Sequence, residues 1–210
     1  MIEVDEQINS TERRLGSRTF DDGEARTVVI ARTYDASVED VWDACTNPER
    51  IPRWFLPVSG ELRAGGRYQL EGNAGGTIES CDPPHGFVAT WEFGGNMSRI
   101  VLQLSDAGGG RTRFQLEHTA PDGEHWTQFG PGAVGIGWEL GLMGLGLHLS
   151  SGAAADPKAS AAWSASEQGR RFISLSSERW CDAAIEAGGN PADARAAAER
   201  TARFYAGAGG

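Results

Sequence analysis

The sequence predicts an α+β fold in which a seven-stranded antiparallel sheet wraps around one long helix, with a helical extension after it. Three observations predict this fold. A strand pattern at 26–34 is followed by six short runs of alternating polar and apolar residues between 59 and 119, separated by Gly and Pro turn signals. A strongly apolar stretch of helix length, 134–149, comes next. Consecutive strands with short turns form an antiparallel meander, and its apolar face needs a covering helix.

The composition is that of a folded, acidic protein. Of the 210 residues, 40% are hydrophobic and 23% are charged, which allows a buried core and excludes global disorder. Nineteen basic against 29 acidic residues give a net charge of −10. A chain this acidic lacks the basic surface that nucleic acid and anionic membranes require, so neither is expected as a partner.

The sequence also predicts a cytoplasmic location. The first residues, MIEVDEQINS, are polar and do not form a signal peptide. The three cysteines are odd in number and far apart, which favours reduced thiols over disulfides. The apolar stretch 134–149 would span about 24 Å as a helix, less than a membrane core, and it contains Glu139. We therefore expect a buried helix and no membrane association.

The first strand, 26–34, is followed by two expected short helices. Ser37 is a suitable N-cap for the first, along which apolar residues recur at i, i+3, i+4 and i+7. Asn47-Pro48 combines an N-cap with a proline at the first helical position and starts the second. The apolar faces of the two helices consist of Val38, Val41, Trp42, Cys45, Ile51, Trp54 and Phe55.

The meander follows these helices. Its expected strands are 59–63, 67–71, 76–81, 86–93, 98–105 and 111–119. Alternation is clearest in the last two, where one set of residues should face the core: Ile100, Leu102, Leu104, Phe114, Leu116 and His118. The intervening residues should face solvent: Arg99, Gln103, Arg113, Gln115 and Glu117.

The long helix carries an unusual stripe of small residues. Gly137, Gly141 and Gly144 align with His148 on one side of it. Each glycine costs about 1 kcal/mol of helix stability relative to alanine, so the stripe needs a reason. Two explanations remain open: the glycines leave room for a ligand, or they let the C-terminal helices pack closely.

The predicted organisation has three parts. Residues 1–25 form a polar N-terminal lead-in, 26–150 form the main domain, and 151–210 form a linker and a helical extension. A capping box starting at Ser164 and an Asn190-Pro191 pair predict helices at about 166–187 and 191–206. The extension has little core of its own, so we expect it to dock on the main domain or on a second copy in a homodimer.

This order of strand, two short helices, meander and long helix is the helix-grip arrangement. The chain resembles the START-like (SRPBCC) superfamily, in the bacterial branch named after the activator of the heat-shock-protein-90 ATPase. The resemblance covers about 26–150 and rests on the segments Arg32–Phe55, Pro57–Pro84, Thr90–Gly95, Thr112–His118 and Phe129–Leu142.

The resemblance implies a cavity between sheet and helix, and several kinds of function. The superfamily includes lipid carriers, hormone receptors, polyketide cyclases and co-chaperone domains, so the fold alone does not fix the activity. The branch name implies a stress response and a chaperone partner. The co-chaperone proper has an additional N-terminal domain that binds the chaperone, and residues 1–25 are too short to supply it.

The candidate ligand-binding residues are those that this fold would place around the cavity. Core packing is the ordinary role of aromatic residues, but aromatics on the concave face would form an apolar pocket with few polar groups, the usual form of a small-molecule site. The candidate set is Trp54, Phe55, Tyr68, Trp91, Phe93, Phe114, Leu116, His118, Trp138 and Leu142.

His118 has two interpretations. On the inward face its pKa should fall through desolvation. It is either a core histidine satisfied by a neighbouring group, which we favour, or the polar group that orients a ligand or acts as an acid or base.

No motif in the sequence assigns a reaction. There is no H-x-x-x-H, C-x-x-C, G-x-S-x-G or P-loop pattern, so no metal, cofactor or catalytic residue is assigned. The first hypothesis is therefore a non-enzymatic protein that binds an apolar small molecule. The alternatives are a chaperone-associated interaction protein and an enzyme similar to polyketide cyclases and dehydratases.

Overall fold

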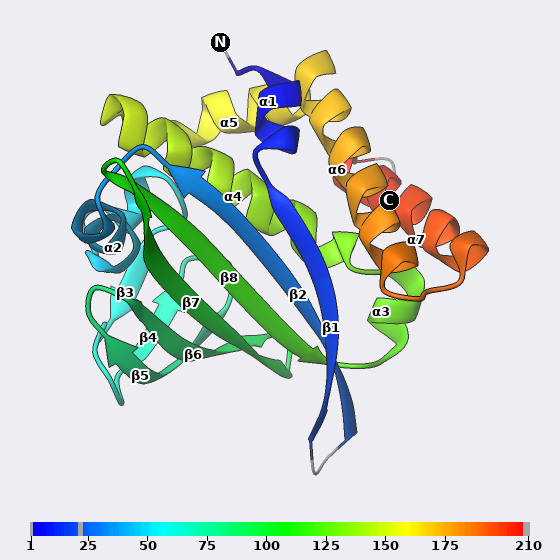
Figure 1. Ribbon diagram of the computed structural model, residues 1–210, viewed down its shortest axis with the longest axis horizontal. Helices are drawn as coiled ribbons and strands as arrows, with labels where there is room; N and C mark the ends of the chain where they lie inside the picture. Colours follow the sequence, from blue (N-terminus) through cyan, green and yellow to red (C-terminus); the bar gives the residue numbers. More distant parts are fainter. Residues whose placement is uncertain (1, 21–22, 208–210) are drawn as a thin grey trace. The chain divides into compact units, whose positions relative to one another are not determined.

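The computed structural model describes residues 2–20 and 23–207, and Figure 1 shows its elements. Met1, Asp21 and Asp22 of the predicted lead-in lie outside the described residues. In chain order the elements are α1 (Val4–Asn9), β1 (Glu12–Phe20), β2 (Gly23–Tyr34), α2 (Val38–Thr46), the 3₁₀ turn η1 (Ile51–Arg53), β3 (Val58–Gly60), β4 (Arg67–Leu70), β5 (Gly75–Asp82), β6 (Gly86–Phe93), β7 (Asn96–Gly108), β8 (Arg111–Pro121), α3 (Glu124–Phe129), α4 (Gly132–Ser151), α5 (Pro157–Ser164), α6 (Glu167–Glu186) and α7 (Pro191–Tyr205).

The strands form one sheet in the order β1-β2-β8-β7-β6-β5-β4-β3. The meander from β3 to β8 is antiparallel throughout, as predicted. The sheet has eight strands where the sequence predicts seven, because β1 lies within the predicted lead-in. Residues 12–20 contain few apolar side chains, so no alternation marks them as a strand. This strand can be polar because it lies at the sheet edge.

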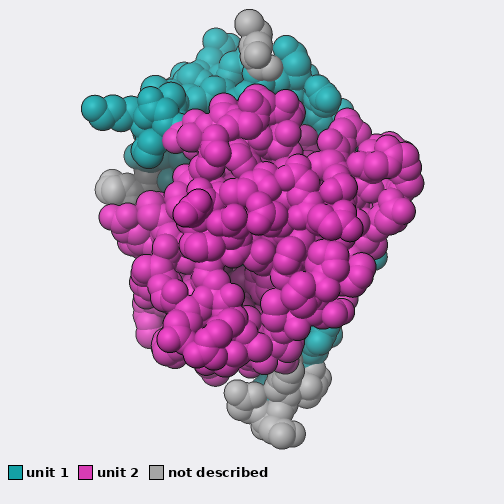
Figure 2. All heavy atoms as spheres, turned by 90° about the vertical axis from the view of Figure 1, so that its left-hand side faces the viewer, with its two compact units in different colours: residues 1–30, 121–140, 156–210 teal, residues 31–120, 141–155 magenta. Residues whose placement is uncertain are grey.

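The chain divides into two compact units, coloured in Figure 2. Unit 1 consists of residues 1–30, 121–140 and 156–210, and unit 2 of 31–120 and 141–155. These units are built from separate stretches of the chain, whereas the predicted parts 1–25, 26–150 and 151–210 are continuous. The predicted boundaries at residues 25 and 150 therefore stay a prediction.

The inward face of unit 2 is the one that alternation predicts. Cross-strand pairs place His118 opposite Ile100 and Phe114 opposite Leu104. All six residues expected to face the core are buried, while Arg99 and Gln103 are exposed. The period-two pattern therefore assigned the faces of β7 and β8 correctly.

In unit 2 two glycines of α4 pack against the segment 50–55, which precedes β3. A Cβ atom on Gly144 would lie 2.5 Å from the Trp54 carbonyl oxygen, so only glycine admits this backbone. A Cβ on Gly141 would make ordinary contacts, 3.5 Å from the Phe55 ring. On the other side, the Tyr34 hydroxyl donates a hydrogen bond to the Leu142 carbonyl oxygen at 2.9 Å. Leu142 itself is buried, as expected.

In unit 1 the glycines of α4 face the C-terminal helices. A Cβ on Gly135 would lie 2.2 Å from the ring of Trp180 in α6, and one on Gly137 would lie 3.1 Å from the hydroxyl of Tyr205 in α7. Packing of the C-terminal helices, one of the two explanations left open, fits the position of Gly137, whereas Gly144 admits the segment 50–55, which neither explanation anticipated. The two helices α6 and α7 lie side by side in Figure 1.

Glu139 interrupts the apolar helix because it has a buried partner in unit 1. The Arg13 guanidinium forms two parallel hydrogen bonds with its carboxylate, at 2.7 and 2.6 Å, and both side chains are almost fully buried. Such pairing is what allows charges to be buried.

Three predicted segments differ in detail. The second short helix is only the single 3₁₀ turn η1, because Trp54 leaves helical geometry with φ −137°. The predicted loop before the long helix contains α3, and the predicted linker contains α5, which Asp156 caps and Pro157 begins. Within residues 2–20 and 23–207, no helix combines the length and the apolar character that crossing a membrane requires.

The glycine contacts give a paired prediction. Gly144→Ala should destabilise the protein by about 1–3 kcal/mol, because its methyl group collides with a backbone oxygen that has nowhere to move. Gly141→Ala is the matched control and should stabilise by up to about 1 kcal/mol through helix propensity. Urea unfolding of both variants checks this, and equal stability of the two would contradict the packing described.

Candidate functional site

The inward face of the sheet in unit 2 brings several predicted residues together. Tyr68 pairs with Gly76, and Trp91 pairs with Ser98, in one row across β4 to β7. The rings of Trp91 and His118 lie 5.9 Å apart, edge to face. These contacts place one histidine within an aromatic surface.

His118 is the buried polar group of this face, with 6% of its surface exposed. Its Nε2 lies 2.8 Å from Ser98 Oγ, and that hydroxyl donates to the Trp91 carbonyl oxygen at 3.0 Å. This arrangement is satisfied when Nε2 carries the proton and donates to Ser98. Desolvation lowers the pKa of His118 to about 4, so the ring is neutral at physiological pH.

The histidine is thus a core residue with a side-chain partner, which is the interpretation that the sequence favoured. Contact between His118 and a ligand stays a prediction. Ser98 was not among the predicted residues. Its position opposite Trp91 depends on the register of β6 and β7, which alternation alone does not specify.

Tyr68 pairs with Gly76 on the neighbouring strand, and its side chain reaches the next strand beyond it. Its hydroxyl donates to the Thr90 carbonyl oxygen at 2.7 Å, and burial raises the pKa of this phenol above its ordinary range. A Cβ on Gly76 would lie 2.2 Å from the same oxygen, so a larger residue would displace the contact. Tyr68 is therefore fixed on the sheet by a hydrogen bond.

A second group of predicted residues lies where the segment 50–55 meets α4. The rings of Trp54 and Phe55 are 5.4 Å apart, and Trp54 Nε1 donates to the Ala44 carbonyl oxygen at 2.9 Å. Phe55 lies against Gly141, next to Leu142. Both aromatic side chains are half-buried.

The remaining predicted residues differ in their surroundings. Phe114 and Leu116 are core residues, and Phe114 packs edge to face on Tyr34. Phe93 is 57% exposed at the end of β6, where the strand leaves the core. Trp138 is half-buried on the part of α4 that belongs to unit 1.

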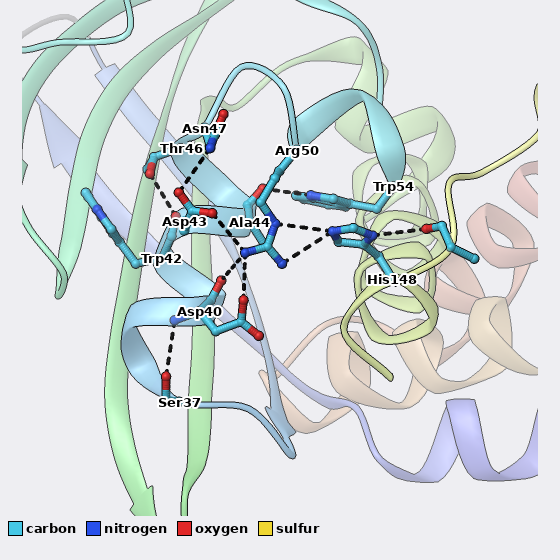
Figure 3. A network of polar contacts seen from close by, with 11 residues as sticks. Ser37, Asp40, Trp42, Asp43, Ala44, Thr46, Asn47, Arg50, Trp54 and His148 are labelled. Atoms are coloured by element: carbon cyan, nitrogen blue, oxygen red, sulfur yellow. Dashed lines mark hydrogen bonds and ion pairs between the residues drawn. The ribbon is translucent and has the colours of Figure 1, made fainter. Parts of the chain in front are cut away.

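A polar network around Arg50 was missed by the sequence analysis (Figure 3). The Arg50 Nη1 lies 2.6 Å from Asp40 Oδ1 and 2.9 Å from Asp43 Oδ2, both on α2. Its Nε and Nη2 each lie 3.3 Å from Nε2 of His148 on α4. The Asp40 and Asp43 spacing on one helix face was visible in the sequence, but their partner was not.

The described residues contain no cluster of metal ligands, and the thiol of Cys45 is not activated. Among the described residues, no three His, Cys, Asp or Glu side chains converge as metal ligands would. Burial raises the pKa of Cys45 to about 12, so its thiol stays protonated and is a poor nucleophile.

Two surface depressions lie elsewhere. One, of about 490 Å³, is formed by β5 to β8 and includes Asp82, His85 and Gln103. The other, of about 410 Å³, lies between α6 and α7. None of the ten predicted ligand-binding residues lines either depression.

Comparison with known proteins finds one family and several solved structures. The family described as Activator of Hsp90 ATPase homolog 1-like protein matches residues 35–148. The crystal structure of CalU16 from Micromonospora echinospora is 36% identical, covering 83% of this chain and 98% of that chain with a TM-score of 0.65. Its solution NMR structure is 37% identical, with 86% and 97% coverage and a TM-score of 0.69.

A more distant structure shares the fold. Protein MLL2253 from Mesorhizobium loti is 21% identical, covering 60% of this chain and 97% of that chain with a TM-score of 0.53. No protein with a curated description matches.

The environment of His118 predicts a loss of stability in mild acid. The histidine must be buried neutral, with a pKa of about 4 against 6.5 in the unfolded chain, so the unfolded state binds more protons between these values. Stability should therefore fall as the pH drops from 6.5 to 4, by up to about 3 kcal/mol. Thermal melts of the wild type and of His118→Gln across this range test it. Parallel pH profiles for the two proteins would show that His118 does not titrate this way.

Proposed function

We propose that this chain, which belongs to the Activator of Hsp90 ATPase homolog 1-like family, binds an apolar small molecule against the inward face of the unit 2 sheet. The observation that carries the proposal is that aromatic side chains and one neutral polar pair lie together on this face. A half-buried tryptophan and tyrosine lie on the same face as a polar pair, the buried His118 and the half-buried Ser98, and the histidine is held neutral. Apolar walls with one or two placed polar groups are typical of small-molecule sites.

The polar pair indicates which ligand group would be recognised. Ser98 Oγ donates to Trp91 and lies in hydrogen-bond range of His118, which leaves one of its two acceptor lone pairs available. A ligand hydroxyl or N–H would donate to that lone pair. The apolar remainder of the ligand would gain roughly 25 cal/mol for each Å² that it buries.

Trp54 and Phe55 also support the proposal. They are half-buried rather than fully packed, and they lie against Gly141 in the part of α4 that belongs to unit 2. We propose that these two rings, with Leu142, form the second wall of the site. No reaction is proposed, because neither a sequence motif nor the contacts of His118 and Ser98 assign one.

The family's description favours a second candidate, a chaperone-associated interaction protein. That role would need an exposed binding surface and no internal ligand. The two candidates therefore differ in their response to a small apolar probe.

The binding proposal predicts saturable uptake of a neutral apolar dye. N-phenyl-1-naphthylamine should quench tryptophan emission with 1:1 stoichiometry, because the proposed site is lined by Trp54 and Trp91. 2-Naphthol should displace it more effectively than naphthalene, by about fivefold, through the hydrogen bond to Ser98.

Ser98→Ala should abolish the preference for 2-naphthol, because it removes the hydroxyl that would accept the ligand's hydrogen bond. Ser105→Ala on the same strand is the matched control, since Ser105 is exposed, and it should keep the preference. Absence of saturable dye binding to the wild type would leave the interaction-protein candidate in its place.

A further inference from the structure

The outward face of the unit 2 sheet carries the depression of about 490 Å³ that the neighbouring strands β5 to β8 form (Figure 1). It lies on the side of the sheet opposite to the proposed ligand site, because Gln103, which lines it, alternates along β7 with the buried Leu102 and Leu104. Its volume is in the range of small-molecule sites, about 300–1,000 Å³. The proposed function gives this depression no role.

A glycine lies at the centre of the depression. Cross-strand pairs place Asp82, Gly86 and Gln103 in one row, with Gly86 in the middle. A Cβ on Gly86 would lie 2.2 Å from the Leu102 carbonyl oxygen, so no larger residue fits at this position. Because neighbouring strands are about 4.8 Å apart, Asp82 and Gln103 stand about 10 Å apart, with no side chain between them in the row.

The row next to the glycine is apolar. Val88 on β6 pairs with Val101 on β7, and both line the depression. Both valines are half-buried. The solvent face of an antiparallel sheet is ordinarily polar, so two adjacent valines form an apolar patch beside the gap.

A hydrogen-bond donor and an acceptor lie on opposite sides of the gap. Gln115 Nε2 donates to Gln103 Oε1 at 3.2 Å, which directs the Gln103 amide and leaves its two N–H groups as donors. The Asp82 carboxylate supplies acceptors only. The turn that carries it is held by backbone bonds, from the His85 amide to the Asp82 carbonyl oxygen at 2.6 Å and from the Leu104 amide to the His85 carbonyl oxygen at 2.7 Å.

The charges and shapes of the lining indicate a class of ligand. One acidic and one basic side chain, Asp82 and Arg113, line the depression, so their formal charges cancel and favour a neutral molecule. Such a molecule must donate at one side, accept at the other and present an apolar face to the valines. A pyranose sugar meets these conditions, because its hydroxyls both donate and accept at the rim of a ring whose faces carry C–H groups.

We propose that this depression is a second binding site, which takes a neutral pyranose sugar. The C–H face of the sugar lies on Val88 and Val101. Its hydroxyls donate to Asp82 on one side and accept from Gln103 on the other. The site is formed by strands held in register, so it exists before the ligand binds. It goes beyond the proposed function and does not depend on it.

NMR titration of the ¹⁵N-labelled full chain with the methyl pyranosides of glucose, galactose and mannose tests the proposal. At least one should shift the amides of 86–88 and 101–103 saturably, with a dissociation constant of about 1 mM, as expected for an open site and a ligand of this size. It should bind at least about fivefold tighter than cyclohexanol, which has one hydroxyl, and than glycerol, which has no ring.

Three outcomes of this titration would overturn the sugar site. The first is no saturable shift with any of the three pyranosides. The second is binding of cyclohexanol or glycerol with the same affinity. The third is tighter binding of inorganic phosphate, which would make the depression an anion site.

Two variants locate the site on the sheet. Asp82→Asn should weaken pyranoside binding at least about tenfold, because a charged acceptor becomes neutral, and Gln103→Ala should weaken it about fivefold. Glu71→Gln is the matched control, since it makes the same change from acid to amide at an exposed residue outside the depression. Wild-type affinity in both site variants would overturn the proposal. Gln103 is exposed, so at least this variant should fold, and thermal melting verifies it.

Competition with N-phenyl-1-naphthylamine separates this site from the inward one. The dye should bind with the same affinity in the presence of saturating pyranoside. Displacement of the dye would place the sugar on the inward face and overturn the second site. A dye that does not bind at all would overturn the proposed function, whereas the titration with pyranosides would still decide whether the outward site exists.

Discussion

The helix α4 is strongly apolar, so most of its surface has to be covered, although Leu147 near its end is exposed, and this requirement shapes both compact units. In unit 1 the cover comes from α6 and α7, with Trp180 against Gly135. In unit 2 it comes from the segment 50–55, with the Trp54 backbone against Gly144. At both places the lack of a side chain on glycine lets the neighbouring segment approach the α4 backbone closely. The closer packing offsets the loss of helix propensity that a glycine causes.

Polar groups inside these apolar surroundings come with partners. Glu139 on α4 has Arg13, His148 on the same helix has Arg50, and His118 on the sheet has Ser98. Leaving any of them unpaired would cost far more than the net gain of making the bond. They therefore fix which segments meet, more than they add to stability. Among the described residues, Ser176 Oγ and Trp180 Nε1 are the buried side-chain atoms without such a partner.

These constraints connect the fold to the proposed function. The inward sheet face has to be apolar because it is covered, and the same property makes it suitable for an apolar ligand. His118 is neutral there because burial disfavours the charged imidazole. A neutral imidazole suits a site for an uncharged molecule. The segment 50–55 brings two aromatic rings against Gly141, near the middle of α4.

The sequence by itself determined the α+β class, the succession of strands from β2 to β8 with the long helix after them, and the inward faces of β7 and β8, but not α1, β1, α3 or α5. These features depend on local periodicity. The alternation along β7 and β8 predicts that Ile100 and His118 face the core, and this holds whichever residues they pair with. Local signals also marked the caps Ser37 and Asn190, whereas α6 is capped by Ser166 and not by Ser164, where the predicted capping box begins. The edge strand β1 was not predicted, because a strand at the sheet edge needs no alternation of apolar residues.

Only the tertiary structure decided which residues meet. Ser98 reaches His118, Arg50 reaches His148, and Arg13 reaches Glu139 across separations of 20, 98 and 126 residues. Such pairs depend on strand register and on how helices pack, and neither leaves a periodic trace in the sequence. The glycines of α4 were visible as a stripe, but the carbonyl oxygen and the ring that they admit belong to distant segments. Periodicity therefore fixes the faces of elements, and packing fixes their partners.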